Sequence, residues 1–130
     1  MKGLIVDEPW IGAILSGRKS WEMRSSRTTH RGRFALIRKG SGLVVGLADL
    51  IGCEPAIVSL EAYAAAEARH CIPAERQKAA FEGRWRIPWV LADVVSLARP
   101  VPYVHPRGAV TWVVLADDVA ATIADALSAP

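Results

Sequence analysis

Short apolar segments separated by turn residues predict six strands in this chain. Two glycines in the segment 39–42 favour a tight hairpin between the third and fourth strands, since glycine adopts positive φ without steric cost. Residues 100–103, Pro-Val-Pro-Tyr, are expected to be extended between the last two strands. The predicted strands are Lys2–Val6, Ser20–Arg24, Phe34–Arg38, Leu43–Ile51, Trp89–Leu97 and Val110–Leu115.

Apolar residues at helical spacing predict the remaining elements. A first short helix starts at Asp7-Glu8-Pro9 and ends at Gly17, because an acidic cap with a following proline begins helices and glycine ends them. Ser59 is placed as the cap of an alanine-rich helix. The later helices are predicted over Ser59–Cys71, Ala74–Phe81 and Asp118–Leu127.

The order of these elements predicts the fold class. Strands and helices do not alternate in a βαβ rhythm, which favours an α+β fold over a parallel α/β sheet. We expect a small, mostly antiparallel β-barrel with three or four helices packed at its edge. Residues 1–130 contain no linker, repeat or low-complexity segment, so a single domain is expected.

Composition narrows the class of protein. Apolar residues make up 52% of the 130 positions, enough for a substantial core. No apolar run approaches the ~20 residues needed to span a bilayer, and the charged N-terminal residues do not resemble a signal peptide. Two cysteines, Cys53 and Cys71, are too few for a secreted disulfide scaffold. These features predict a cytoplasmic protein with reduced thiols and no membrane partner.

Lys19, Glu22 and Arg24 form the most informative constellation. In an extended segment, side chains alternate between two faces. Glu22 and Arg24 should therefore share one face, which we expect to point outward, while Trp21 and Met23 point into the core. Lys19 stands at the entrance of the strand and can reach both charged residues. The cluster suits a ligand site, or alternatively a network that only pins a loop to the sheet.

Charge is distributed unevenly. Residues 18–39 hold eight of the sixteen basic residues and one acid, so this segment carries +7 and the rest of the chain −4. Such a local positive field favours phosphate-bearing ligands. A solvated loop between two strands is the alternative explanation.

The segment Gly17-Arg18-Lys19-Ser20-Trp21-Glu22-Met23-Arg24 resembles the G-x-K-x-x-E-x-R signature of ASCH domains, which belong to the PUA-like superfamily. The resemblance extends over most of the chain in a consistent order. Further similar segments are Pro9–Trp10, Arg31–Ile37, Val45–Asp49, Trp89–Val94 and Pro100–Tyr103, followed by Gly108 and Trp112.

This resemblance implies a five- or six-stranded barrel, a cleft beside the signature, and binding of RNA or nucleotide-like ligands. Some bacterial members are enzymes, with ribonuclease activity or hydrolysis of the amide of N4-acetylcytidine. The amidohydrolases use a lysine, a threonine and a glutamate. The lysine matches Lys19, but the threonine position is occupied here by Glu22, so the proposed nucleophilic hydroxyl is missing.

We therefore predict an RNA-binding or modified-nucleoside-binding domain. Lys19 and Glu22 are the candidate catalytic or base-contacting residues, and Trp10 and Trp85 the candidate stacking platforms. Phosphate contacts are assigned to basic residues, and Tyr103 is placed in a loop that lines the cleft. The basic candidates are Arg18, Arg24, Arg31, Arg38 and Lys39.

Two other functions stay open. A metal-independent ribonuclease or nucleoside amidohydrolase would use Lys19 and Glu22, and a protein-interaction module would use the basic face. No cofactor or metal is expected, because no phosphate-binding loop, dinucleotide motif or zinc-ligand spacing occurs. The helical segment 59–81 is expected to pack on the barrel rather than to act as a lid. The sequence gives no indication of the oligomeric state.

Overall fold

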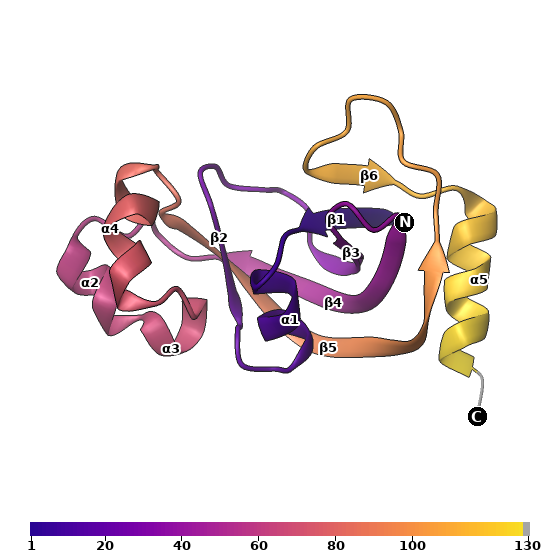
Figure 1. The fold of residues 1–130 in the computed structure, drawn as a ribbon, viewed down its shortest axis with the longest axis horizontal. Coiled ribbons are helices and arrows are strands. Elements are labelled where there is room, and N and C mark those ends of the chain that lie inside the picture. The colour runs from indigo at the N-terminus through magenta and orange to yellow at the C-terminus, as the bar shows by residue number, and fades with distance from the viewer. Residues whose placement is uncertain (129–130) are drawn as a thin grey trace.

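A single six-stranded sheet organises the computed structural model, which describes residues 1–128 (Figure 1). The strand order is β2-β5-β4-β3-β1-β6. The strands are β1 (Lys2–Val6), β2 (Trp21–Arg24), β3 (Gly32–Arg38), β4 (Leu43–Cys53), β5 (Ile87–Pro102) and β6 (Trp112–Val114). The helices are α1 (Trp10–Leu15), α2 (Leu60–Ala65), α3 (Glu67–His70), α4 (Ala74–Glu82) and α5 (Asp117–Ser128).

The sheet is curled into a half-barrel. Neighbouring strands run antiparallel except β1 and β3, which are parallel. In the part of the chain that the structure describes, no pairing joins the edge strands β2 and β6, so the predicted barrel does not close. Register shifts between β4 and β5 mark bulges, which bend and twist a strand pair. The α+β class is confirmed, and residues 1–128 contain five helices instead of the three or four expected.

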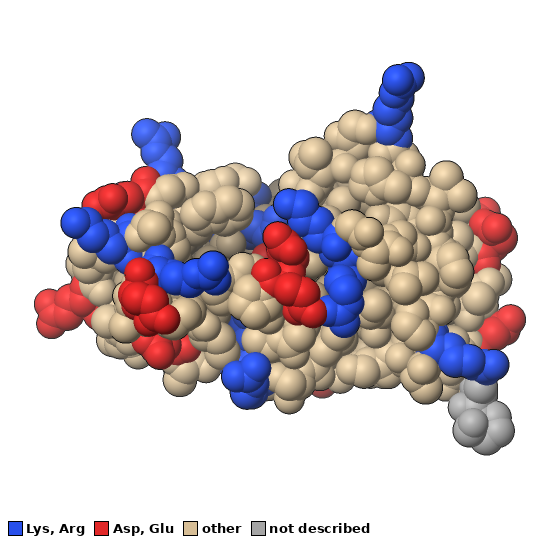
Figure 2. Space-filling model, viewed as in Figure 1, with Lys and Arg blue, Asp and Glu red and all other residues tan. Residues whose placement is uncertain are grey.

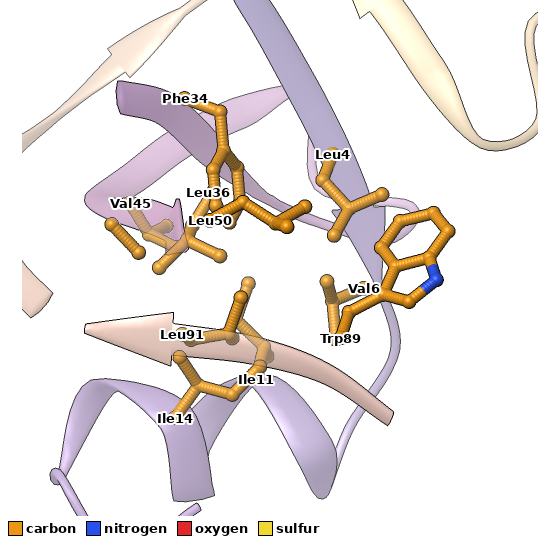
Figure 3. Close-up of a cluster of buried hydrophobic side chains, with 11 residues drawn as sticks. Leu4, Val6, Ile11, Ile14, Phe34, Leu36, Val45, Leu50, Trp89 and Leu91 are labelled. Atoms are coloured by element: carbon orange, nitrogen blue, oxygen red, sulfur yellow. The ribbon is translucent and has the colours of Figure 1, made fainter. Parts of the chain in front are cut away.

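The main core lies inside the curled sheet. Side chains of β1, β3, β4 and β5 meet the apolar face of α1 there, including Leu4, Phe34, Leu36 and Ile11 (Figure 3). A second cluster on the outer face of the sheet is covered by α5, whose Ile123 is buried. Strand β3 is therefore buried on both faces, as its uninterrupted apolar run indicates.

Residues 54–86, called the helical lobe below, contain α2, α3 and α4 and lie at the end of the molecule opposite α5 (Figure 1). Ser59 caps α2 as predicted, since its hydroxyl accepts a hydrogen bond from the Ala62 amide. The predicted Ser59–Cys71 helix is nevertheless broken at Ala66, where the backbone leaves the helical conformation. Cys71 then ends α3 in the left-handed conformation, with φ of 58°.

The lobe reverses the expected orientation of β2. Trp21 and Met23 were expected to point into the barrel core, but both pack on the lobe, in a cluster with Tyr63. Glu22 and Arg24 were expected to point outward, yet Arg24 reaches the Ile5 carbonyl of β1 and lies over the Trp89 ring. The alternation along β2 is as predicted, and the assignment of its two faces is wrong because the lobe supplies a separate core.

Among the remaining strands, β5 and β6 differ most from prediction. The expected Trp89–Leu97 strand and the extended segment after it form one sixteen-residue strand, β5. The final strand is shorter than Val110–Leu115 and spans Trp112–Val114. The hairpin at 39–42 is confirmed, with Gly40 and Gly42 both at positive φ.

Candidate functional site

A cleft separates the sheet from the helical lobe. Its walls come from β2, α1 and the end of β1 on one side, from α4 and Trp85 on the other, and from Val110 and Thr111 before β6. The cleft has a volume of about 640 Å³, within the range of pockets that hold small ligands. Figure 2 shows basic and acidic side chains gathered where the lobe meets the body of the molecule.

Lys19 is buried at the floor of this cleft, with 2% of its surface exposed. Its Nζ donates a hydrogen bond to the His70 carbonyl at 2.6 Å and lies 3.7 Å from the Glu22 carboxylate. The same ammonium lies 5.3 Å from the centre of the Trp10 ring. Burial lowers the pKa of Lys19 from its ordinary value, and the nearby Glu22 opposes that shift without cancelling it.

Glu22 stands between two cations. Its Oε2 accepts a hydrogen bond from the Arg24 Nε at 3.0 Å and forms an ion pair with the Arg24 Nη2 at 2.8 Å. Its Oε1 faces Lys19 at 3.7 Å, which is beyond hydrogen-bond distance. Glu22 lines the cleft, and no hydrogen bond from any of residues 1–128 reaches its Oε1. Arg24 also donates to the Ile5 carbonyl at 3.1 Å, which fixes its orientation.

Two tryptophans, Trp10 and Trp85, line the cleft, and they differ in what their rings contact. Trp10 contacts two cations, Lys19 at 5.3 Å and Arg76 at 5.7 Å from its ring centre. Trp85 is 44% exposed, and among residues 1–128 no aromatic ring or cation pairs with it. Its carbonyl accepts a hydrogen bond from the Tyr63 hydroxyl at 2.7 Å. Trp85 is therefore the indole with a face available for stacking.

The structure brings six of the predicted site residues together and places four elsewhere. Lys19, Glu22, Arg24, Lys39, Trp10 and Trp85 line the cleft. The other four are outside it: Arg18 donates to the Ser16 hydroxyl, Arg31 to the Thr28 and His30 carbonyls, Arg38 pairs with Glu8, and Tyr103 hydrogen-bonds His105. The basic segment is thus spread over several faces.

Sequence reasoning missed the contribution of the helical lobe. Arg76, Ala79 and Ala80 of α4 and the preceding Ile72 line the cleft. No local motif marks these residues, because they approach β2 only through the packing of α2–α4. The lobe therefore both packs against β2 and forms one wall of the cleft.

The described residues hold no cluster of three or more His, Cys, Asp or Glu side chains arranged for a metal ion. Both cysteines are free thiols. Every helix in residues 1–128 is too short or too polar to cross a bilayer.

The sequence matches the ASCH domain family over residues 4–100. Among solved structures, the chain is similar to the ASCH protein from Zymomonas mobilis, with a TM-score of 0.71 and 15% identity over 95% of this chain and 93% of that chain. A tyrosine-to-phenylalanine variant of that protein gives a TM-score of 0.69 at 15% identity, over 95% of this chain and 96% of that one. At such identity the likeness shows a shared fold alone. Among curated proteins, no sequence matches this chain.

Proposed function

Since this chain belongs to the ASCH domain family, we propose that it binds RNA or a modified nucleoside and holds one nucleoside unit in the cleft. The observation that carries this proposal is the buried Lys19–Glu22–Arg24 network at the floor of a cleft that also contains an exposed indole. Polar groups fixed at the base of a mostly apolar pocket are the usual arrangement for orienting a small ligand.

Glu22 and Lys19 together offer an acceptor beside a donor. The Glu22 Oε1 atom accepts an N–H from a base edge, since a carboxylate in its ionised form only accepts. Lys19 has three protons and uses one on the His70 carbonyl, so it has a proton to donate to a neighbouring ring nitrogen or carbonyl. The ligand therefore presents an N–H donor next to an acceptor, as nucleobases do.

Trp85 supplies the stacking surface for that base. Stacking of a base on an aromatic side chain contributes ~1–3 kcal/mol. Gly83 supports the position of the indole, because a Cβ at residue 83 would lie 3.1 Å from a Trp85 ring carbon.

The basic residues of segment 18–39 lie on several faces of the molecule. This distribution favours binding of a single nucleoside unit over binding of a long RNA strand along one continuous basic surface. Arg27 donates to the Cys53 and Glu54 carbonyls, and Arg33 to the Asp93 carbonyl. These guanidiniums, like those of Arg31 and Arg38, are engaged by the protein itself. Phosphate contacts from this segment would come mainly from Lys39, which lines the cleft, because the guanidinium of Arg24 is held by Glu22 and the Ile5 carbonyl.

Binding of ribonucleosides and of short single-stranded RNA, followed by tryptophan fluorescence and calorimetry, tests the proposal. Glu22→Gln should weaken binding about tenfold or more, because it removes a charged acceptor. Glu8→Gln is the matched control, since Glu8 pairs with Arg38 outside the cleft. Equal affinities for wild type, Glu22→Gln and Lys19→Met would exclude this site.

Hydrolysis of an RNA phosphodiester or a nucleoside amide is the second candidate function. It is favoured by the lowered pKa of Lys19, since an amine with a pKa nearer neutrality is a better proton-transfer group. Incubation with labelled RNA and with N4-acetylcytidine, followed by chromatography of products, tests both reactions. Turnover that disappears in Lys19→Met would establish an enzyme, whereas binding without turnover would leave a recognition domain.

A further inference from the structure

The four cations that line the cleft differ in how far they are neutralised. Lys19 and Arg24 are both tied to Glu22 and to backbone carbonyls. Lys39 lies 4.0 Å from Asp7, at the limit of an ion pair. Arg76 has no ion pair and no side-chain hydrogen bond with any of residues 1–128. Within residues 1–128, Arg76 is therefore the arginine of the cleft whose guanidinium donates no hydrogen bond.

The side chains that line the cleft carry a net positive charge. Four cations against the two carboxylates of Asp7 and Glu22 leave a formal charge of +2, and of +1 when Lys19 is neutral. Asp7 offsets Lys39, and Glu22 offsets one of its two neighbouring cations. Arg76 on the lobe side has no carboxylate partner among residues 1–128, so it carries the whole surplus when Lys19 is neutral. A ligand that is neutral throughout would leave this charge unmatched, so an anionic group is favoured beside α4.

Arg76 is also positioned close to the floor of the site. Its guanidinium lies 5.7 Å from the centre of the Trp10 ring, and the Lys19 ammonium lies 5.3 Å from the same centre. Both cations therefore contact the same indole. The distance between them cannot exceed the sum of their two distances from the ring centre. The ring face restrains the guanidinium through a cation–π contact. In a nucleotide, a ribose holds the base and the phosphate apart. One nucleotide can therefore place its base at Lys19 and its phosphate at Arg76.

We propose that the ligand of this cleft carries a phosphate group next to its base, and that Arg76 of the helical lobe binds this phosphate. The inference rests on the proposed function and deepens it from a nucleoside unit to a nucleotide unit. Arginine suits the role because its planar guanidinium presents paired N–H donors that match phosphate oxygens. The phosphate belongs either to a free nucleoside monophosphate or to a phosphodiester of single-stranded RNA.

The proposal assigns different tasks to the two walls. The β2 wall, through Lys19 and Glu22, contacts the base, and the α4 wall, through Arg76, selects for the phosphate. Loss of Arg76 should then remove the preference for phosphorylated ligands without changing the affinity for the nucleoside alone. A variant of the base-contacting wall should weaken both ligands equally.

Calorimetric titrations of the full chain with the four ribonucleosides, their 5′-monophosphates and short single-stranded oligoribonucleotides test this assignment. Wild type should bind the phosphorylated form of its preferred nucleoside about tenfold or more tightly than the nucleoside. Arg76→Gln should abolish that preference, and 0.5 M salt should weaken it. Lys78→Gln is the control, since Lys78 lies exposed on the same helix but does not line the cleft.

The outcomes separate this inference from the function on which it rests. Nucleoside binding that depends on Glu22 but shows no phosphate preference, and no change in Arg76→Gln, would overturn the inference and keep the proposed function. Absence of binding by nucleosides, monophosphates and RNA alike would overturn both. An Arg76→Gln defect with monophosphates supports a free nucleotide as the source of the phosphate, and a defect seen with oligonucleotides alone supports RNA.

Discussion

The Lys19 ammonium donates a 2.6 Å hydrogen bond to the backbone carbonyl of His70, which lies 51 residues later in the chain. Lys19 precedes β2, and His70 is the last residue of α3. This bond joins the signature segment to the helical lobe at the floor of the cleft. The Lys19 side chain therefore belongs to the candidate site. It also helps to hold the helical lobe, which forms the other wall of the cleft, in position.

Lys19→Met should destabilise the fold by about 1–3 kcal/mol. The change leaves the buried His70 carbonyl without its donor and removes one of the two cations beside Glu22. Chemical denaturation compared with Lys39→Met measures the cost, because Lys39 is largely exposed and should change stability by less than about 0.5 kcal/mol. A Lys19→Met protein as stable as Lys39→Met would show that the bond contributes little.

The pKa of Lys19 should be lower than that of an ordinary lysine, because burial disfavours the ammonium. Above the native pKa, the unfolded chain binds more protons than the folded one. This group's contribution therefore makes stability rise with pH between the lowered pKa and the ordinary value of 10.5. NMR titration of ¹³C-labelled lysine side chains measures the pKa directly, with Lys19→Met assigning the signal. A value at or above 10.5 would contradict the prediction.

His70 should make the protein sensitive to acid. Its Nδ1 accepts a hydrogen bond from the Ile72 amide, and its Nε2 pairs with the Tyr63 carbonyl, so the buried ring is neutral with the proton on Nε2. Burial first, and then the Lys19 charge, lower the pKa of His70 below 6.5. The unfolded chain then binds more protons between the native pKa and 6.5, so stability falls as pH falls through that window.

Denaturation curves at a series of pH values between 7 and 5 measure this dependence. His70→Asn keeps an acceptor near the Nδ1 position and removes the titration, so its stability should fall less over the same range. Identical pH dependence in wild type and His70→Asn would attribute the acid sensitivity to other groups.

Tyr63 should ionise at a higher pH than an ordinary tyrosine. Burial, assisted by the negative charge of Glu22, raises the pKa of Tyr63 to about 12. The folded chain keeps this proton between the ordinary value of 10 and about 12, so this contribution to stability is lost as pH rises through that window. Ultraviolet titration of the two tyrosines should show one transition near pH 12 that is missing from Tyr63→Phe. The substitution should also cost ~0.5–1.5 kcal/mol, since the bond to the Trp85 carbonyl is lost.

Gly46→Ala should destabilise the sheet where β4 approaches β5 and α1. A Cβ at residue 46 would lie 2.7 Å from the Val95 carbonyl oxygen and 2.6 Å from a Leu15 methyl carbon. The backbone oxygen cannot rotate away, so overpacking should cost about 1–3 kcal/mol in thermal or chemical unfolding. Gly52→Ala on the same strand is the control, because no atom lies within 4 Å of its Cβ position. Equal stability of the two variants would contradict the steric argument.

Much of the fold followed from local patterns. Apolar runs and turn residues located the six strands, and glycines at 40 and 42 located the hairpin. The break at Ala66 did not follow, because helix propensity continues through that residue. The fusion of two segments into β5 did not follow either, because Arg99 and Pro100 interrupt the apolar pattern between them. In the first case the packing of α2 and α3 on β2 and α4 decided the boundary, and in the second the pairing with β4 did.

The candidate site was predictable in part. The spacing of Lys19, Glu22 and Arg24 identified the polar floor of the cleft, and charge clustering pointed to anionic ligands. Charge clustering along the sequence misplaced Arg31 and Arg38, because the curled sheet turns successive residues of one segment to different faces. Arg76 carried no local signal, and only the fold of the lobe brings it over Trp10.

By itself, the sequence determined that β2 has one charged face and one apolar face, because side-chain alternation is a local property of an extended backbone. It did not determine which face is enclosed by the sheet, since alternation has no inside or outside until a second element packs against the strand. The tertiary structure decided this when the lobe covered Trp21 and Met23 with its own core. Glu22 and Arg24 were then left facing the cleft, whose other wall contains Arg76 and whose floor is joined to the lobe through the bond between Lys19 and His70.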